Sequence, residues 1–385
     1  MRRLVLAGGG HAHVEVLRRF GLQPEPGAEI LVVSPGSHTP YSGMLPGLVA
    51  GHYSFRESHI DLRALAGFAG ARLEPARVAA IHPGARELVL EDGRRLSYDV
   101  LSLDIGSVPP VGAIDGASEV GTAVKPVEGF LAALHQRIHD PAFRPATVAV
   151  VGGGAGGVEI VLSLHFRFAS ARGDSPGRPP RFTLVAGPSG LLPGHPAAVR
   201  RLLADVLAAR DIGCRQGVSV SRAMPGGLQL TGGDEVGADW IVWATGAAPA
   251  PWLRGTGLAL DDRGFIRVGR ALECVSHPGV FAAGDVASVD GDPRPRAGVF
   301  AVRQGPPLAE NLRRALRGLP LVPFRLQRRA LSLISTGDRH AIASWGPFAA
   351  SGRWVWRWKD RIDRRFMGTY ALAPDNVTPG GPPVA

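Results

Sequence analysis

Two clusters of glycine in this 385-residue chain have a spacing that could hold the pyrophosphate of a dinucleotide. The clusters are Gly8-Gly9-Gly10, and Gly152 with Gly154 and Gly157. In such a turn the first glycine permits a tight bend, the second lets the backbone approach the pyrophosphate, and the third lets the next helix pack on the strand. The N-terminus of that helix adds free N–H groups and the positive end of its dipole. These residues therefore indicate chemistry on bound dinucleotides.

The first cluster departs from this pattern and the second does not. His13 stands at the third glycine position of the first cluster, and Ser34 replaces the acid expected after its second strand. A serine hydroxyl still bonds a ribose hydroxyl, although without the charge-assisted strength of a carboxylate. After the second cluster the corresponding positions hold Ala186 and Gly187. A carboxylate there would repel the 2′-phosphate of NADP, so its absence leaves the choice between NADH and NADPH open, with a slight preference for NADH.

The elements that must position these turns follow one pattern twice. Apolar runs at 3–7 and 147–151 enter the glycines, helical stretches at 13–20 and 158–168 follow, and further apolar runs lie at 30–33 and 182–185. Strand, glycine turn, helix and strand open a dinucleotide-binding fold. We therefore predict an α/β protein with two Rossmann-like domains.

Shorter signals fill the rest of the chain. Runs at 71–73, 78–82 and 87–90 suggest strands, with Asp92-Gly93 as a hairpin turn. A polar loop is expected at 171–180, a hairpin at 331–335 and 341–343, and a frayed tail beyond 373. Gly305-Pro306-Pro307 predicts the start of a helix over 308–316, because proline is tolerated in a first turn.

Composition narrows the class of protein. Lys and Arg number 43 against 33 Asp and Glu, a net charge of +10, but no nucleic-acid motif accompanies it. The two cysteines, Cys214 and Cys274, form no redox pair and fit a reducing compartment. No metal site is expected, since His11 and His13 make no convincing ligand pair. No apolar run is long enough to span a membrane.

Three further segments complete a resemblance to a known family. Residues 277–285 form an apolar strand ending in Gly284-Asp285, and residues 241–246 form another ending in Thr245-Gly246. With the two turns, they resemble the pyridine nucleotide–disulfide oxidoreductase superfamily over residues 1 to about 370. Without a cysteine pair, the chain is most similar to the type II NADH:quinone oxidoreductase-like branch. Residues 7–21, 39–53 and 352–367 also resemble the oxidoreductase module found fused ahead of selenophosphate synthetase.

The resemblance implies a glutathione reductase-like fold with FAD and NAD(P)H as cofactors. It implies an FAD-binding domain over 1–115 and 266–323, an NAD(P)H-binding domain over 116–265, and a C-terminal region over 324–385. The residues it implies for FAD are Gly8, Gly9, Gly10, His11, Ala12, Ser34, Pro40, Tyr41, Pro46, Asp104, Gly106, Gly284 and Asp285. Those implied for the nicotinamide dinucleotide are Gly152, Gly154, Ala155, Gly157, Glu159, Thr245 and Gly246. Asp104 departs from the family, which usually has Ala-Thr where this chain has Asp104-Ile105.

The candidate catalytic residues come from the same resemblance. Glu159 matches a glutamate near the nicotinamide, and Gln304 matches a position near the quinone side of the flavin. The alternatives are a surface helix glutamate and a glutamine at a helix entry. The helix after Gly305 is expected to point its N-terminus at the flavin, where its dipole would favour the reduced form.

The C-terminal stretch 353–367 is basic and rich in tryptophan. Trp354, Trp358, Ile362 and Phe366 recur every four residues, so they form one stripe on a helix. The stripe could lie on an anionic membrane, or it could pack on the flavin domain or on the partner of a homodimer. We expect a cytoplasmic protein, with peripheral attachment to the inner face of the cell membrane left open.

The sequence therefore predicts an NAD(P)H-oxidising FAD enzyme. Hydride passes from NAD(P)H to the flavin by proximity and alignment, and a small acceptor such as a quinone reoxidises it. Two alternatives stay open. One is a redox-sensing or interaction flavoprotein with little turnover, and the other is a reductase that serves selenium metabolism.

Overall fold

The structure is a computed structural model, and it describes residues 1–140, 142, 144–170, 179–292, 296–325 and 330–372. Most of the loop predicted over 171–180 and the tail predicted beyond 373 lie outside these residues. Two parallel five-stranded sheets organise the described chain. The α/β class and the two Rossmann-like sheets that the glycine turns predict are confirmed.

The first sheet has the order β19-β9-β1-β2-β5. Its strands are β1 (Arg2–Ala7), β2 (Ala28–Ser34), β5 (Arg72–Pro75), β9 (Val100–Leu103) and β19 (Val280–Ala282). All four pairings are parallel. Helices α1 (His11–Leu22), α4 (Leu62–Phe68) and α8 (Gly298–Arg317) complete this unit. β1 and β9 are buried almost throughout, as strands covered on both faces are.

The second sheet has the order β10-β17-β11-β12-β13. Its strands are β10 (Thr122–Ala123), β11 (Thr147–Val151), β12 (Arg181–Ala186), β13 (Gly213–Gln216) and β17 (Trp240–Trp243). Helices α5 (Val127–His139), α6 (Ala155–Ser170) and α7 (Ala197–Ala209) belong to it. Its core includes Trp240 and Phe130, whose rings stack, beside residues of α6.

Smaller antiparallel sheets decorate both units. They are β6 (Val78–His82), β7 (Glu87–Leu90) and β8 (Arg95–Ser97), then β14 (Val220–Met224), β15 (Gly227–Leu230) and β16 (Glu235–Gly237). The predicted Asp92-Gly93 turn joins β7 to β8. Two short pairs are the antiparallel β3 (His38–Pro40) with β4 (His59–Asp61), and the parallel β18 (Ile266–Val268) with β20 (Ala287–Val289).

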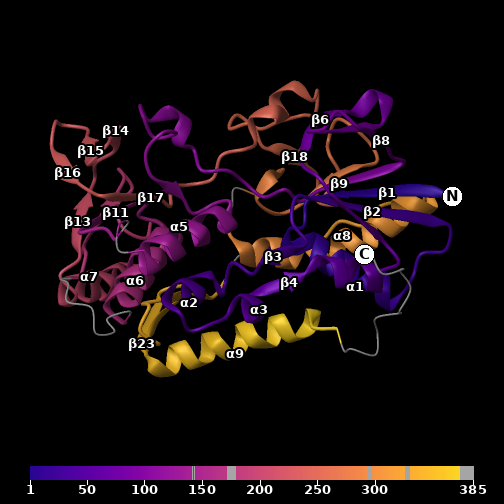
Figure 1. Cartoon of the computed structure of the whole chain (residues 1–385). Coiled ribbons are helices and arrows are strands. Elements are labelled where there is room, and N and C mark those ends of the chain that lie inside the picture. Colours follow the sequence, from indigo (N-terminus) through magenta and orange to yellow (C-terminus); the bar gives the residue numbers. More distant parts are fainter. Residues whose placement is uncertain (141, 143, 171–178, 293–295, 326–329, 373–385) are drawn as a thin grey trace.

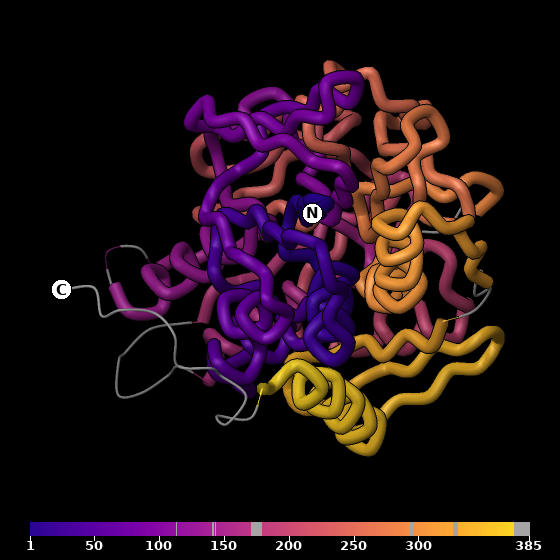
Figure 2. Tube along the Cα trace, turned by 90° about the vertical axis from the view of Figure 1, so that its right-hand side faces the viewer, coloured from indigo at the N-terminus to yellow at the C-terminus, as the bar shows by residue number. Residues whose placement is uncertain are grey.

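A third unit joins the two sheets along one edge of the molecule. The predicted hairpin is present as β21 (Ser332–Ser335) and β22 (Ala341–Trp345), and β23 (Phe348–Gly352) adds a third strand. Helix α9 (Arg353–Tyr370), yellow in Figures 1 and 2, then runs past α2 (Leu45–Ala50) and α3 (Phe55–Ser58). Because α2 also packs on α6, these elements fix the two sheets relative to one another.

The start of α8 corrects one prediction from the sequence. The helix begins at Gly298, and Pro306 and Pro307 lie inside it, so no helix starts at Gly305. The cause is tertiary packing. A Cβ on Gly305 would lie 2.6 Å from Cβ of Glu15, so this glycine permits close contact between α8 and α1. Gln304 is therefore a mid-helix residue, and the interpretation as a glutamine at a helix entry is wrong.

Candidate dinucleotide-binding site

The first glycine turn is built around the backbone and side chain of Asp104. Gly8 has φ +98°, and a Cβ there would lie 2.3 Å from the carbonyl oxygen of Asp104. A Cβ on Gly10 would lie 2.2 Å from Cγ of Asp104, and one on Gly9 would lie 2.4 Å from a methyl group of Leu62. Gly8 must be glycine, because its φ is positive and a Cβ there would meet backbone, whereas at Gly9 and Gly10 a Cβ would meet the side chains of Leu62 and Asp104.

His13, which replaces the third glycine, is completely buried beneath this turn. Its Nδ1 lies 2.7 Å from the carbonyl oxygen of Gly8, and its Nε2 lies 2.8 Å from the hydroxyl of Ser102. A carbonyl only accepts, so Nδ1–H donates to Gly8 and the serine hydroxyl donates to Nε2. Burial lowers the pKa of His13 to about 4, which agrees with a neutral ring. His13, which stands in place of the third glycine, thus has both ring nitrogens hydrogen-bonded.

The second glycine turn has glycine at all three positions of the pattern. Gly152 has φ +144°, and a Cβ there would lie 2.2 Å from the carbonyl oxygen of Ala244. A Cβ on Gly157 would lie only 2.0 Å from the carbonyl oxygen of Gly152, so this glycine sets the contact between helix and strand. Gly154 faces open space, and Ala155 begins α6. The first-turn N–H groups of α6 have no partner within the helix and suit an anion.

Asp285 follows strand β19 of the first sheet and contacts residues from the segment between β9 and α5. Its Oδ2 accepts from Lys125 at 2.9 Å and from the Ser107 hydroxyl at 3.1 Å. The guanidinium of Arg296 donates to its backbone carbonyl and lies over the ring of Phe265. Asp285 is thus held by cations at the end of β19, although its carboxylate is not fully enclosed.

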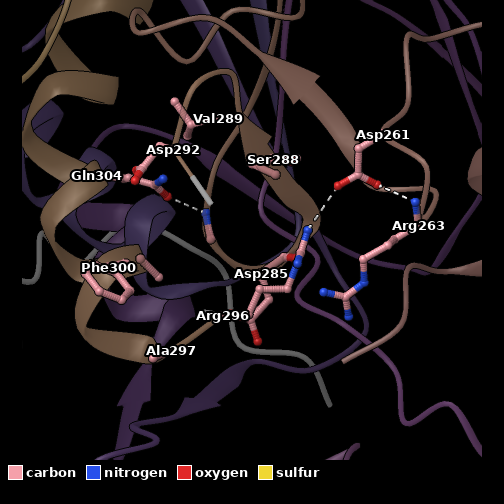
Figure 3. A pocket seen from close by; sticks show the side chains of 13 residues that line it. Asp261, Arg263, Asp285, Ser288, Val289, Asp292, Arg296, Ala297, Phe300 and Gln304 are labelled. Atoms are coloured by element: carbon pink, nitrogen blue, oxygen red, sulfur yellow. Dashed lines mark hydrogen bonds and ion pairs between the residues drawn. The ribbon is translucent and has the colours of Figure 1, made fainter. Parts of the chain in front are cut away.

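A cavity of about 290 Å³ borders Asp285 (Figure 3). Gln304 points across it from α8, and its Oε1 accepts from the backbone N–H of Gly284 at 2.7 Å. The lining residues are Asp261, Arg263, Gly284, Asp285, Ala287, Ser288, Val289, Asp292, Arg296, Ala297, Phe300, Ala301 and Gln304. The structure thus brings Gln304 and Asp285 together, as the sequence analysis expected of two residues beside one flavin.

Glu159 is half-buried in α6, near the charged side chains of Lys359 and Asp363. It accepts from the backbone N–H of Ser335 at 2.8 Å, and burial raises its pKa to about 7. Lys359 of α9 partly offsets this increase. The ammonium of Lys359 lies 2.6 Å from Oδ2 of Asp363 and also donates to the carbonyl of Gly43. Charged residues of α6 and α9 therefore lie close enough to influence one another, and Lys359 also contacts the segment that contains Gly43.

Other residues predicted for the FAD site lie in or beside β2, β3, α1 and α2. Tyr41 stacks on Phe366 with ring centroids 4.2 Å apart, and its hydroxyl hydrogen-bonds Asp363. His11 begins α1 near Tyr41, and burial lowers its pKa to about 4. Pro40 ends β3, Pro46 is buried in α2, and buried Ser34 ends β2 beside Gly9. Ala12 is buried in the first turn of α1.

Two glycines and a threonine leave room for a ligand. Cβ atoms on Gly106 and Gly246 would meet nothing within 4 Å. Among the described residues Thr245 is one of a few whose buried polar atom, here Oγ1, has no partner. An orphaned hydroxyl and open space beside glycine turns fit a bound dinucleotide, because buried polar groups are normally paired.

Sequence reasoning missed four residues of this region. Each contacts a residue far away in the sequence: Lys125 contacts Asp285, Ser102 contacts His13, Lys359 contacts Gly43 and Asp363 contacts Tyr41. One signal was available for the last two. Lys359 and Asp363 are four residues apart, so they share one face of α9, and each follows a residue of the aromatic stripe by one position, about 100° around the helix.

Neither metal ligands nor a membrane span was found in the part of the chain that the structure describes. No cluster of three or more His, Cys, Asp or Glu residues there could hold a metal ion. No helix within the described ranges is both long and apolar enough to cross a bilayer. Cys214 and Cys274 belong to different apolar clusters, in the second and first units.

Two glycine turns at the ends of two parallel sheets are the features of an α/β protein that binds two dinucleotides. The family model described as pyridine nucleotide-disulphide oxidoreductase matches residues 2–305, and this chain belongs to that family. It is an oxidoreductase that uses FAD and NAD(P)H, and it is type II NADH dehydrogenase-like.

Relatives with known names agree with this assignment. An NADH dehydrogenase-like protein of Mycobacterium tuberculosis is 31% identical over 278 residues, which cover 69% of this chain and 68% of the relative. The type II NADH:quinone oxidoreductase of Haemophilus influenzae is 26% identical over 205 residues, covering 51% of this chain and 46% of that protein.

Solved structures share the fold. The sulfide:quinone oxidoreductase of Aquifex aeolicus superposes with a TM-score of 0.76 at 18% identity, covering 98% of this chain and 93% of that one. NDH2 from Plasmodium falciparum, solved in complex with NADH, gives a TM-score of 0.76 at 13% identity, covering 95% and 97%.

Proposed function

We propose that this protein is an NAD(P)H dehydrogenase that passes electrons to a quinone-class acceptor at a membrane surface. The observation that carries the proposal is the place of Glu159. It lies on the helix of the second glycine turn, close enough to Lys359 of α9 for this cation to lower its pKa, while Trp354, Trp358 and Ile362 of the same α9 are exposed. A poorly water-soluble acceptor would approach from that exposed surface. The quinone acceptor named for the Haemophilus relative supports the same class.

The residue roles that we propose are those of the sequence analysis. Gly8 to Ala12, Ser34, Asp104, Gly106, Gly284 and Asp285 hold FAD, and Pro40, Tyr41 and Pro46 line its ring. Gly152, Gly154, Ala155, Gly157, Thr245 and Gly246 hold NAD(P)H. Bound FAD supplies the two-electron chemistry between NAD(P)H and the acceptor. The protein aligns the two cofactors and excludes water.

Anaerobic rapid mixing of the FAD-loaded protein with NADH, and separately with NADPH, tests the proposal. We expect fast loss of flavin absorbance near 450 nm with at least one donor. A second mix with a soluble quinone should restore the absorbance at a comparable rate. Slow bleaching without recovery would reject the quinone role and favour the redox-sensing alternative. A protein that never retains FAD would reject the proposal altogether.

Glu159→Gln should change the pH dependence of flavin reduction. The ionised carboxylate would stabilise the positive charge that develops on the nicotinamide as hydride leaves. Because burial raises the pKa of Glu159 to about 7, we expect the native rate to rise as pH increases through about 7. The variant should be slower by about tenfold or more above that pH and nearly pH-independent. The measurement is the single-turnover reduction rate between pH 5.5 and 9. A variant with an unchanged profile would remove Glu159 from the reaction.

The outer face of α9 is the proposed membrane contact. Trp354, Trp358 and Ile362 are 57%, 42% and 41% exposed, whereas Phe366 turns inward onto Tyr41. Trp345 and Phe348 continue this apolar surface at the neighbouring hairpin, at 57% and 70% exposure. Arginines of α9 surround the stripe and favour anionic lipid.

Trp358→Glu should weaken binding to vesicles that contain phosphatidylglycerol. Losing one inserted aromatic group corresponds to roughly tenfold or more in affinity. Vesicle co-sedimentation measures the effect, with the exposed residue Val275 changed to Glu as the matched control. Equal binding by both variants would contradict the membrane proposal. If the native chain sediments as a dimer and Trp358→Glu as a monomer, the surface is a homodimer contact instead.

A further inference from the structure

The carboxylate of Asp104 fills the anion-binding end of helix α1. Its Oδ2 accepts from the backbone N–H of Ala12 at 2.8 Å and from that of His13 at 3.2 Å. Its backbone carbonyl accepts from Gly10 at 3.2 Å, and the residue is only 3% exposed. These are N–H groups of the kind that a glycine turn offers to a dinucleotide phosphate.

Comparison with the second glycine turn of the same chain shows that a carboxylate at the position of Asp104 is unusual. Gly8 approaches the backbone of Asp104 as Gly152 approaches the backbone of Ala244, so the two positions correspond. Alanine has no group that could reach the N-terminus of α6, which stays available for a ligand. The first copy therefore carries its own negative group at the place where the second copy has none.

The other carboxylate oxygen of Asp104 lies between the two glycine segments that we propose to hold FAD. Oδ1 of Asp104 is 2.3 Å from the position of a Cβ on Gly10 and 2.3 Å from that of a Cβ on Gly284. Gly10 and Gly284 belong to the two segments proposed to hold FAD. An ionised carboxylate between them would repel a pyrophosphate strongly, because little water is there to screen two like charges. A protonated carboxyl would instead donate a hydrogen bond to a phosphate oxygen.

We propose that FAD binds this protein with Asp104 protonated, so that binding of one FAD takes up one proton from solution. The inference rests on the proposed FAD site and adds a pH-linked step to its loading. The proton goes to Oδ1 of Asp104, while Oδ2 keeps the two N–H groups of α1. No other covalent change is involved.

The charges around Asp104 agree with this proton uptake. Burial raises the pKa of its carboxyl to about 7, and Asp285 raises it further, while the N–H groups of Ala12 and His13 oppose the rise. His13 and His11 on α1 have pKa values lowered to about 4, so neither titrates near neutrality. Lys125 is bound to Asp285, Ser102 is neutral, and Gln304 faces Gly284 from α8. Asp104 is thus the group placed to change charge there between pH 6 and 8.

Titration of the apo-protein with FAD between pH 6 and 9, followed by flavin fluorescence, tests the inference. The native dissociation constant should increase above pH 7 and approach about tenfold for each pH unit. Calorimetry at pH 8 in two buffers with different ionisation enthalpies should give an uptake of about one proton. Asp104→Asn keeps both acceptor contacts with α1 and carries no charge. It should bind FAD with little pH dependence, and at pH 9 more than about tenfold more tightly than the native protein.

Asp99→Asn is the matched control, since Asp99 accepts from the backbone of Arg3 in the same sheet but lies away from the turn. It should keep the native pH dependence. Equal pH dependence in the native protein and Asp104→Asn would overturn the inference and leave the FAD site intact. So would weaker binding by Asp104→Asn at every pH. A native protein that binds no FAD at any pH would overturn the proposed function instead.

Discussion

Gly157→Val is expected to stop reduction by NAD(P)H while the protein still holds FAD. A Cβ at Gly157 would lie 2.0 Å from the carbonyl oxygen of Gly152, a distance that no real Cβ accepts. Helix α6 must therefore move away from β11, and its N-terminal N–H groups move with it. A displacement near 1 Å costs about 100-fold in a well-aligned site. We expect the rate of flavin reduction at subsaturating NADH to fall by about 100-fold or more.

The control for this prediction is Gly129→Val, in α5. A Cβ at Gly129 meets nothing within 4 Å, so this variant shares the substitution and the helical setting without the clash. It should reduce at the native rate. Overpacking by Gly157→Val should also lower the free energy of unfolding by about 1–3 kcal/mol. A Gly157→Val protein that keeps native kinetics would show that the second turn does not bind the hydride donor.

The two Rossmann-like units could be predicted from sequence because their signals are local. A buried strand, a glycine turn and the following helix lie within about twenty residues, so the pattern can be recognised in one short stretch, although most of the close contacts that require the glycines come from distant residues such as Asp104 and Ala244. The same holds for the Asp92-Gly93 hairpin, where the turn residues lie next to the strands they join.

The start of α8 could not be predicted in this way. Proline usually marks a first turn, and two in succession strengthen that signal. What overrides it is the contact of Gly305 with α1, nearly 300 positions earlier in the chain. Packing decides such a boundary, and propensity is only a weak prior.

The unusual chemistry of the first turn is also non-local. His13 was recognised as a departure, but its partner Ser102 and the carboxylate of Asp104 lie about ninety positions away. The internal duplication was the available signal. His13 corresponds to Gly157 and Asp104 to Ala244, so both departures fall in the first copy. His13 and Asp104 contact one another at the same turn, so we expect the two departures to serve one function. The pH-linked binding of FAD proposed above is such a function.

Lys359→Met is expected to destabilise the protein far more than the loss of a surface ion pair. Lys359 and Asp363 are 9% and 4% exposed, and the lysine also bonds the backbone of Gly43 in the proposed flavin-lining segment. Removing the cation leaves the carboxylate of Asp363 buried, with Glu159 nearby. Breaking one partner of such a pair costs about 3–5 kcal/mol. Urea unfolding should show a loss of that size at pH 8.

Two comparisons separate this prediction from general damage to α9. Arg314→Met removes a cation from a pair of the same spacing on α8, with Glu310, but those side chains are 33% and 52% exposed. That variant should lose less than about 1 kcal/mol. The double variant Lys359→Met/Asp363→Leu should be more stable than Lys359→Met alone, because no aspartate charge remains unpaired.

The pH dependence gives the sharper test of the charges. In Lys359→Met the missing cation no longer opposes the raised pKa of Glu159, so this carboxyl takes up a proton more readily. The stability deficit should therefore shrink as pH falls through the higher pKa that Glu159 has in the variant and toward the native value of about 7. A deficit that is the same at pH 6 and pH 8 would assign the loss to packing alone. A deficit that shrinks would link α9, the nicotinamide-side helix and the flavin-lining segment through one set of buried charges.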